Sequence, residues 1–261
     1  MLLNGVDVSK YQGVIDWAKV KAARIDFAMI RATLGWDNDN QIDPQLHNNV
    51  RGCEANGMPY GFFHYSWAST PEDTKKEAAF FLRNIAGYKP TMPIAFDFEE
   101  AFQVGGVKSG KTYVGFSLEL QLSIIEAFMA EIEKAGYFGM LYMSKSALQR
   151  LYDYAPDRIA KFAVWVAHVN VAATSYTGKY GIWQYSWTGS VPGIAVPVDM
   201  DYCYNDYPAI IKRVGLNGWG KAEESKEEPD YKALYLAEQA KHAATQAKLD
   251  EIRAGLVELL K

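Results

Sequence analysis

Short apolar segments alternate with amphipathic segments from residue 5 to residue 199, and this alternation limits the fold more than any other feature of the sequence. The apolar segments have the length and the β-branched and aromatic content of buried strands. We predict eight strands, at residues 5–8, 27–31, 60–65, 94–99, 138–143, 162–167, 181–185 and 196–199. We predict helices between them, at residues 14–23, 44–56, 71–85, 116–135 and 145–152.

Strands that alternate with helices form parallel sheets, and eight such strands favour closure into a barrel over an open sheet. No Gly-rich dinucleotide-binding or phosphate-binding motif follows an early strand. Helices become scarce after the sixth predicted strand. The predicted fold class is therefore α/β: an eight-stranded (β/α) barrel of the TIM type, with few helices in its last third, followed by a C-terminal helix.

Composition and charge exclude several classes of protein. The chain has 261 residues, of which 49% are hydrophobic, so it can bury a large core. A net charge of −4 gives no general attraction to nucleic acid, and no run of about 18 apolar residues predicts insertion into a membrane. The two cysteines, Cys53 and Cys203, are too few for a disulfide scaffold and are expected to be free thiols. No cofactor is expected.

The sequence changes character after residue 214. Residues 215–229 contain glycine, then a charged run, then proline, which is typical of a linker. Residues 230–261 are rich in Ala, Leu, Lys and Glu and predict a long helix. Four apolar residues of this helix follow coiled-coil spacing: Leu249, Ile252, Leu256 and Leu259. We predict a barrel at 1–214, a linker at 215–229 and a helix at 230–261, which either forms a homo-oligomer or packs against the barrel.

Acidic residues occur in a segment that otherwise has the pattern of a buried strand, Pro93-Ile-Ala-Phe-Asp-Phe-Glu-Glu100. Side chains alternate between the two faces of a strand, so Asp97 and Glu99 share one face and the large apolar side chains share the other. The apolar face is expected to meet the helices. Asp97 and Glu99 then point into the barrel at the C-terminal end of a strand, where active sites of such barrels are built, and Glu100 points away.

Two further strands show the same alternation. Asp7 in the first strand, and Asp199 and Asp201 in the last, are predicted to point inward. The first and last strands of a closed barrel are neighbours, so Asp7 and Asp199 should approach each other, opposite Asp97 and Glu99. Carboxylates in one barrel mouth repel each other, which raises the pKa of at least one of them and provides a proton donor near neutral pH.

Other kinds of site fit the sequence less well. Clustered carboxylates also suit Mg²⁺ or Ca²⁺, but the sequence has no EF-hand loop, no His-Glu-x-x-His motif and no cluster of Cys and His. His64 and His168 are expected to be hydrogen-bonded structural residues, and no Gly-x-Ser-x-Gly motif supports a serine nucleophile. Two carboxylates beside aromatic residues favour glycoside hydrolysis. Residues i and i+2 of a strand have Cα atoms about 6.6 Å apart, which fits both retaining and inverting reactions.

Seven motifs follow one another along the chain: Gly5-Val-Asp-Val-Ser-Lys-Tyr-Gln-Gly13, Ile30-Arg-Ala-Thr33 with Gly35, Tyr60-Gly-Phe-Phe-His-Tyr65, Pro93-Ile-Ala-Phe-Asp-Phe-Glu99, Val164-Trp-Val-Ala167, Ile182-Trp-Gln-Tyr185 and Val198-Asp-Met-Asp201. In this order and spacing they resemble the glycoside hydrolase family 25 lysozymes over residues 3–210. The resemblance implies an irregular α/β barrel. It also implies cleavage of the β-1,4 bond between N-acetylmuramic acid and N-acetylglucosamine in bacterial peptidoglycan.

The resemblance further implies roles for individual residues. Glu99 would be the general acid/base, with Asp97 beside it and with Asp7 and Asp199 completing an acidic floor. The substrate acetamido group is expected to act as internal nucleophile, oriented by Asp97. The implied substrate-binding residues are Arg31, Tyr65, Trp165, Trp183, Gln184 and Asp201. For Tyr65, Trp165 and Trp183, packing in the core is the alternative to stacking on a sugar. Asn often stands at the family position of Asp201, so the site of this chain would hold one more acid.

The implied biological role is that of a phage or prophage endolysin, whose partner is the glycan strand of the bacterial wall. The N-terminal segment MLLNGVDVSKYQG lacks the basic and apolar regions of a signal peptide, so we expect synthesis in the host cytoplasm and action on the wall after release. Two alternatives belong to other classes: a catalytically inactive wall-binding or structural module, and a barrel glycosidase that acts on chitin.

Overall fold

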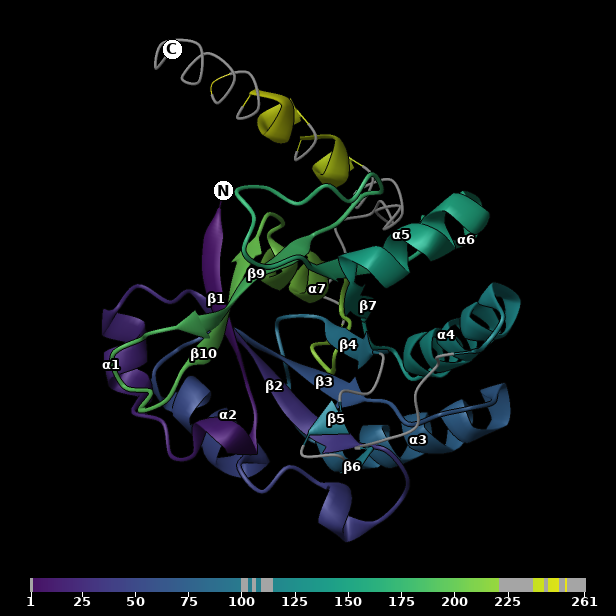
Figure 1. Cartoon of the computed structure of the whole chain (residues 1–261). Coiled ribbons are helices and arrows are strands. Elements are labelled where there is room, and N and C mark those ends of the chain that lie inside the picture. The colour runs from purple at the N-terminus through teal and green to yellow at the C-terminus, as the bar shows by residue number, and fades with distance from the viewer. Residues whose placement is uncertain are drawn as a thin grey trace.

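The computed structural model of the chain describes residues 2–99, 103–104, 107–108, 115–220, 237–241, 244–248 and 252. Eight strands form a closed barrel in the order β1-β10-β9-β8-β7-β4-β3-β2 (Figure 1). They are β1 (Leu3–Val8), β2 (Phe27–Leu34), β3 (Tyr60–Tyr65), β4 (Ile94–Asp97), β7 (Gly139–Ser144), β8 (Ala163–Ala167), β9 (Ile182–Gly189) and β10 (Val198–Cys203). The short strands β5 (Gln103–Val104) and β6 (Val107–Lys108) form a separate antiparallel pair. The predicted α/β barrel is confirmed.

Seven α-helices are described: α1 (Trp17–Ala22), α2 (Leu46–Ala55), α3 (Pro71–Ile85), α4 (Leu118–Lys134), α5 (Lys145–Tyr154), α6 (Pro156–Ile159) and α7 (Tyr207–Val214). Helix α3 begins where predicted, because the Thr70 hydroxyl accepts a hydrogen bond from the N–H of Asp73 and Pro71 occupies the first turn. Helices α6 and α7 were not predicted. Within the described residues, no helix has both the length and the apolar character that a membrane crossing requires.

The last barrel strand departs from the predicted parallel sheet. β10 runs antiparallel to both of its neighbours, β1 and β9, whereas the six other neighbouring pairs are parallel. Only residues 190–197 connect β9 to β10. A crossover that returns a strand in the parallel direction needs a dozen or more residues, so this short connection forces the antiparallel arrangement.

Two apolar layers hold the strands in place, and strand alternation assigns residues to them. On β2, Phe27 and Met29 belong to the cluster inside the barrel, while Ile30 belongs to the cluster between the strands and the helices. Phe96 of β4 also faces outward, as predicted, and stacks on Phe128 of α4 with ring centroids 4.2 Å apart. Helices α3 and α4 pack against each other on this side of the barrel (Figure 1). The apolar cluster fills the inside of the barrel, and the inward-facing acidic residues lie at the ends of the strands.

The barrel unit extends past the predicted boundary at residue 214. Helix α7 ends at Gly215, which adopts a left-handed conformation with φ of 78°. Asn217 is buried, and its side chain donates hydrogen bonds to the carbonyl oxygens of Pro90 and Met92 and accepts one from the N–H of Phe138. The first residues of the predicted linker are thus part of the barrel unit.

Short parts of the predicted C-terminal helix are described, at residues 237–241 and 244–248. Gln239 is buried, and Gln239, Gln246 and Ala247 line a pocket together with residues of the 173–180 segment. Of the predicted coiled-coil positions, Ile252 is 60% exposed, whereas Leu249, Leu256 and Leu259 lie outside the described residues. Self-association through this helix stays a prediction.

Candidate active site

Five acidic side chains gather at one end of the barrel, where the parallel strands have their carboxyl ends. Asp7 and Asp199 are paired directly in the antiparallel register of β1 and β10, as the closure argument predicts. Asp97 is the last residue of β4, and Glu99 lies just beyond the strand. Asp201 is fully buried on β10. Glu100, which was predicted to point away, lies outside the described residues.

A hydrogen-bonded network centred on Gln184 connects these acids to two aromatic residues. The Gln184 amide nitrogen donates to Asp7 Oδ2 at 2.8 Å. Its carbonyl oxygen accepts from the Tyr142 hydroxyl at 2.9 Å and from Trp187 Nε1 at 3.1 Å. Both ends of the amide are engaged, so Gln184 is fixed in one orientation and acts as a bridge between Asp7 and the pocket wall.

Tyr142 and Trp187 were not among the predicted site residues. Tyr142 follows the same alternation as the acids, because Met140 and Tyr142 face into the barrel while Leu141 and Met143 face outward. Strand periodicity would therefore have identified Tyr142. Trp187 lies where β9 and β10 are out of regular register, between Ser186 and Gly189, so alternation gives no signal for it.

The environment of Glu99 favours its protonated form. Burial raises the pKa of Glu99 to about 7; the charge of Asp199 acts in the same direction, and a hydrogen bond with Tyr142 opposes them. Burial also raises the pKa of Asp199 to about 6, against the effect of a hydrogen bond with Asp7. The predicted proton donor near neutral pH is thus consistent with the local electrostatics.

Asp97 is buried beside Glu99 and has one oxygen without a partner. Burial raises the pKa of Asp97, the charge of Glu99 raises it further, and the guanidinium of Arg31 lowers it. Asp97 Oδ1 makes no hydrogen bond within the described part of the chain. A buried carboxylate oxygen without a donor is costly, so this atom is suited to accept a hydrogen bond from a bound ligand.

Arg31 and Tyr65 lie on the same side of Asp97 in the barrel, because β3 pairs with β4 and β2 lies beyond β3. Arg31 of β2 forms a buried ion pair with Asp43, with Nη2 to Oδ2 at 2.7 Å and Nε to Oδ2 at 2.9 Å. Asp43 was not predicted; its carboxylate also accepts the N–H of Lys10 and of Gln45, which fixes the loop after β1. Tyr65 ends β3 and is half-buried next to Asp97 in the strand register.

Two predicted substrate-binding tryptophans do not lie in the pocket. Trp165 is only 1% exposed inside the barrel, where its Nε1 donates to Asp201 Oδ1 at 2.7 Å. Trp183 is buried on the outer face of β9 and donates to the carbonyl oxygen of His168. Neighbouring residues of a strand face opposite sides, so Trp183 points outward because Gln184 points inward. Trp165 and Trp183 are therefore core residues, as in the alternative given for them from the sequence.

Asp201 is bound inside the protein rather than open to the pocket. Burial raises its pKa; the hydrogen bond from Trp165 lowers it, and the charge of Asp199 raises it. Asp7, whose pKa is raised first by burial and then by Asp199 and Asp201, lies in the same group. Because three close carboxyl groups cannot all ionise, this group holds at least one proton.

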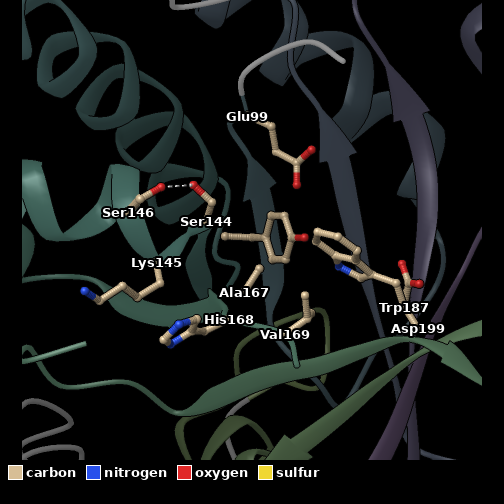
Figure 2. A pocket seen from close by; sticks show the side chains of 10 residues that line it. Glu99, Ser144, Lys145, Ser146, Ala167, His168, Val169, Trp187 and Asp199 are labelled. Carbon is tan, nitrogen blue, oxygen red and sulfur yellow. Dashed lines mark hydrogen bonds between the residues drawn. The ribbon is translucent and has the colours of Figure 1, made fainter. Parts of the chain in front are cut away.

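A pocket of about 690 Å³ opens next to these acids. Its lining residues are Glu99, Tyr142, Ser144, Lys145, Ser146, Ala167, His168, Val169, Trp187 and Asp199. Figure 2 shows Glu99 and Asp199 on separate sides of the pocket, with Trp187 beside Asp199. The volume is in the range of small-molecule sites, and Trp187 adds a half-exposed aromatic surface. Within the described residues, no three or more His, Cys, Asp or Glu side chains are arranged to hold a metal ion.

Comparisons with known proteins show which family this chain is similar to. Residues 6–194 match the model of the family described as Glycosyl hydrolases family 25. The chain is 29% identical to Lysozyme M1 of Streptomyces globisporus over 204 residues, which is 76% of this chain and 66% of that protein. The chain therefore spans about two thirds of the length of this relative.

Solved structures show the same fold. The bacterial lysozyme from Streptomyces coelicolor matches with a TM-score of 0.65 and 29% identity, over 76% of this chain and 90% of that chain. The catalytic domain of endolysin ply40 from bacteriophage P40 of Listeria monocytogenes matches with a TM-score of 0.59 and 25% identity, over 80% of this chain and 96% of that chain. The family model covers most of the barrel, with part of β1 and the whole of β2, β3, β4, β7, β8 and β9. The chain belongs to the glycosyl hydrolases of family 25.

Proposed function

We propose that this protein hydrolyses the β-1,4 bond between N-acetylmuramic acid and N-acetylglucosamine in bacterial peptidoglycan. One observation carries the proposal: Glu99, a carboxyl group with a pKa of about 7, faces a pocket that also contains the carboxyl group of Asp199. Glycoside hydrolysis needs a carboxylic acid that is protonated at working pH next to ionised carboxylates. Similarity to Lysozyme M1 supports the choice of substrate.

In the first step, protonated Glu99 donates its proton to the glycosidic oxygen as the bond to the anomeric carbon breaks. The acetamido oxygen of the same sugar attacks that carbon, which forms a bicyclic oxazolinium ion. The unpartnered Asp97 Oδ1 accepts the acetamido N–H, which orients the nucleophile and stabilises the positive charge. The negative charge of ionised Asp199 favours the same cation.

In the second step, the Glu99 carboxylate takes a proton from water as the water oxygen attacks the anomeric carbon. The bond to the acetamido oxygen breaks, the acetamido group is restored and Glu99 is again protonated. Two displacements at the same carbon leave its configuration unchanged, so this route retains the β-configuration. The product has a new reducing end on the sugar that contributed the acetamido group.

Trp187 is proposed to contact the sugar, in place of the buried Trp183. Trp187 is 51% exposed at the pocket, and its indole nitrogen is already bonded to Gln184. Its apolar ring surface is therefore available for a sugar face, as is common in carbohydrate sites. Gln184 then connects substrate contact at Trp187 to the position of Asp7.

We also propose that the protein acts as an endolysin, made in the cytoplasm and released to the wall. The similarity to the endolysin ply40 catalytic domain supports this role. The test is expression of the chain in a susceptible bacterium with and without a pore-forming membrane protein. Lysis only when the pore is present would support the endolysin role, and lysis without it would contradict that role.

The reaction is tested by turnover of purified cell walls and of chitin by the wild type and by Glu99→Gln. Wild type should digest walls and not chitin. Glu99→Gln preserves size but cannot donate the proton, so its rate should fall 10²–10⁴-fold, the usual cost of losing a general acid. Glu133→Gln, on the exposed surface of α4, is the matched control. Near-normal digestion by a folded Glu99→Gln protein would contradict the role of Glu99.

A further inference from the structure

One wall of the pocket has a polar character that the proposed reaction does not use. Ser144 of β7 pairs with Ala167 of β8 in the parallel register of these strands. The residues that follow them, Lys145 and His168, therefore lie next to each other at the carboxyl ends of two adjacent strands. Both line the pocket, and Figure 2 shows them on the side away from Asp199.

The side chains on this wall provide hydrogen-bond donors. Lys145 is half-buried, and within the described residues no acidic side chain forms an ion pair with it. His168 Nδ1 accepts the backbone N–H of Ser175, which places the hydrogen of the neutral ring on Nε2. Burial lowers the pKa of His168, and the charge of Lys145 lowers it further, so the ring is neutral at pH 7. The Lys145 ammonium and the His168 Nε2–H thus offer donors and no acceptor.

The two sides of the pocket differ in charge. Glu99 and Asp199 make one side acidic, whereas Lys145 makes the other side positive. A neutral sugar can accept hydrogen bonds from Lys145 but has no negative charge to pair with the ammonium group. A sugar with an anionic substituent would place its ring near the acids and its negative charge near Lys145, so it would benefit from both sides.

We infer that Lys145, assisted by His168, forms a subsite for a carboxylate attached to the muramic acid unit of the substrate. The inference rests on the proposed function and specifies which part of the substrate is recognised. Two sources of this carboxylate share the same chemistry: the lactyl group in glycan without peptide, and the peptide stem in intact peptidoglycan. Chitin has neither, so the subsite gives a physical reason for discrimination against chitin.

The test measures binding rather than cleavage, with Glu99→Gln as the background protein so that the glycan stays intact. Three soluble glycan fragments are compared by calorimetry: one with its peptides, one freed of peptides by an amidase, and one freed of peptides with its lactyl carboxylate converted to a methylamide. Each is titrated into Glu99→Gln alone and combined with Lys145→Gln, Lys145→Arg or Lys76→Gln. Lys76 is exposed on α3, outside the pocket, and controls for the loss of one charge.

Lys145→Gln should raise Kd about tenfold, equivalent to about 1.4 kcal/mol, for at least one carboxylate-bearing fragment and leave the methylamide fragment unaffected. An effect on the peptide-bearing fragment alone identifies the stem as the source, and an effect on the peptide-free acid alone identifies the lactyl group. Lys145→Arg should retain binding and Lys76→Gln should change nothing. High salt should remove the effect of Lys145→Gln.

The subsite would be overturned if the Lys145→Gln and background proteins bound both acidic fragments with equal Kd. It would also be overturned if Lys145→Gln weakened binding of the methylamide fragment to the same extent, or if no fragment bound. Turnover by wild type decides the proposed function separately. If wild type fails to cleave walls while the charge-dependent binding persists, the hydrolase proposal fails and the subsite stands. If wild type cleaves walls and Lys145→Gln has no effect on binding, only the subsite fails.

Discussion

Glu99→Gln should make the folded protein more stable at neutral and alkaline pH, even though it removes activity. The pKa of Glu99 is raised from its ordinary value of 4.5 to about 7, mainly by burial. In the pH range between these two values the folded protein binds more protons than the unfolded chain. The free energy of unfolding therefore falls as pH rises from about 4.5 to about 7, and the penalty is complete above that range.

The magnitude follows from the two pKa values. At about 1.36 kcal/mol per pKa unit, a change from 4.5 to about 7 corresponds to a penalty of about 3 kcal/mol for ionised Glu99. Because the side chain is partly open to the pocket, solvent reduces this value, and we expect a gain of about 1–2 kcal/mol in Glu99→Gln at pH 8. Below pH 4 the group is protonated in both states, so the difference between the proteins should disappear.

The assay is urea unfolding of wild type, Glu99→Gln and the control Glu133→Gln at intervals from pH 4 to pH 8. All curves are fitted with one m-value, the dependence of the free energy of unfolding on urea concentration. The control should stay within about 0.5 kcal/mol of wild type throughout, as surface substitutions do. A stability difference for Glu99→Gln that is independent of pH would refute the reasoning. Destabilisation by Glu99→Gln at pH 8 would also refute it, since it would mean that ionised Glu99 stabilises the fold.

Three further predictions concern pH dependence and two buried networks. The kcat/KM for cell walls should follow a bell-shaped pH profile with apparent pKa values near 6 and 7, because Asp199 must ionise and Glu99 must stay protonated. A kcat/KM that still rises above pH 8 would contradict this. Glu77→Ala should lower the free energy of unfolding in urea by about 3–5 kcal/mol, because the fully buried carboxylate accepts hydrogen bonds from Ser66 and Trp67 and is bonded to His64. A loss below about 1 kcal/mol would show that the network contributes little to stability. Asn217→Ala should lower the free energy of unfolding by on the order of 2–4 kcal/mol in the same assay, since it leaves the buried Phe138 N–H without a partner. An unchanged free energy of unfolding would support the predicted end of the barrel at residue 214.

Strand alternation explains most of what the sequence predicted correctly. It placed Asp97 and Glu99 together and assigned Phe96 to the helix-facing layer, where the structure has it. Barrel closure then predicted the meeting of Asp7 and Asp199, which the register confirms. These predictions use only local geometry and ring closure, so they do not depend on how loops or neighbouring side chains are arranged.

The errors arose where tertiary packing decides. The direction of β10 was not predicted, although the short connection at residues 190–197 is too short for a parallel crossover. Family motifs suggested Trp165 and Trp183 for the groove, but Trp165 packs inside the barrel and Trp183 packs on its outer face. His64 is a hydrogen-bonded structural residue, as predicted, bonded to Thr33 and Glu77. His168 is hydrogen-bonded too, yet it also lines the pocket, which no local pattern shows.

The mechanism depends on which sugar contributes the acetamido group, and the products record this directly. Purified peptidoglycan is digested with wild type, the fragments are reduced with borohydride and their reducing ends are identified by mass spectrometry. The account predicts that N-acetylmuramic acid is the reduced sugar, because Glu99 protonates the oxygen that leaves its anomeric carbon. Fragments that end in reduced N-acetylglucosamine would contradict the account, since the enzyme would then cleave the other bond of the glycan strand.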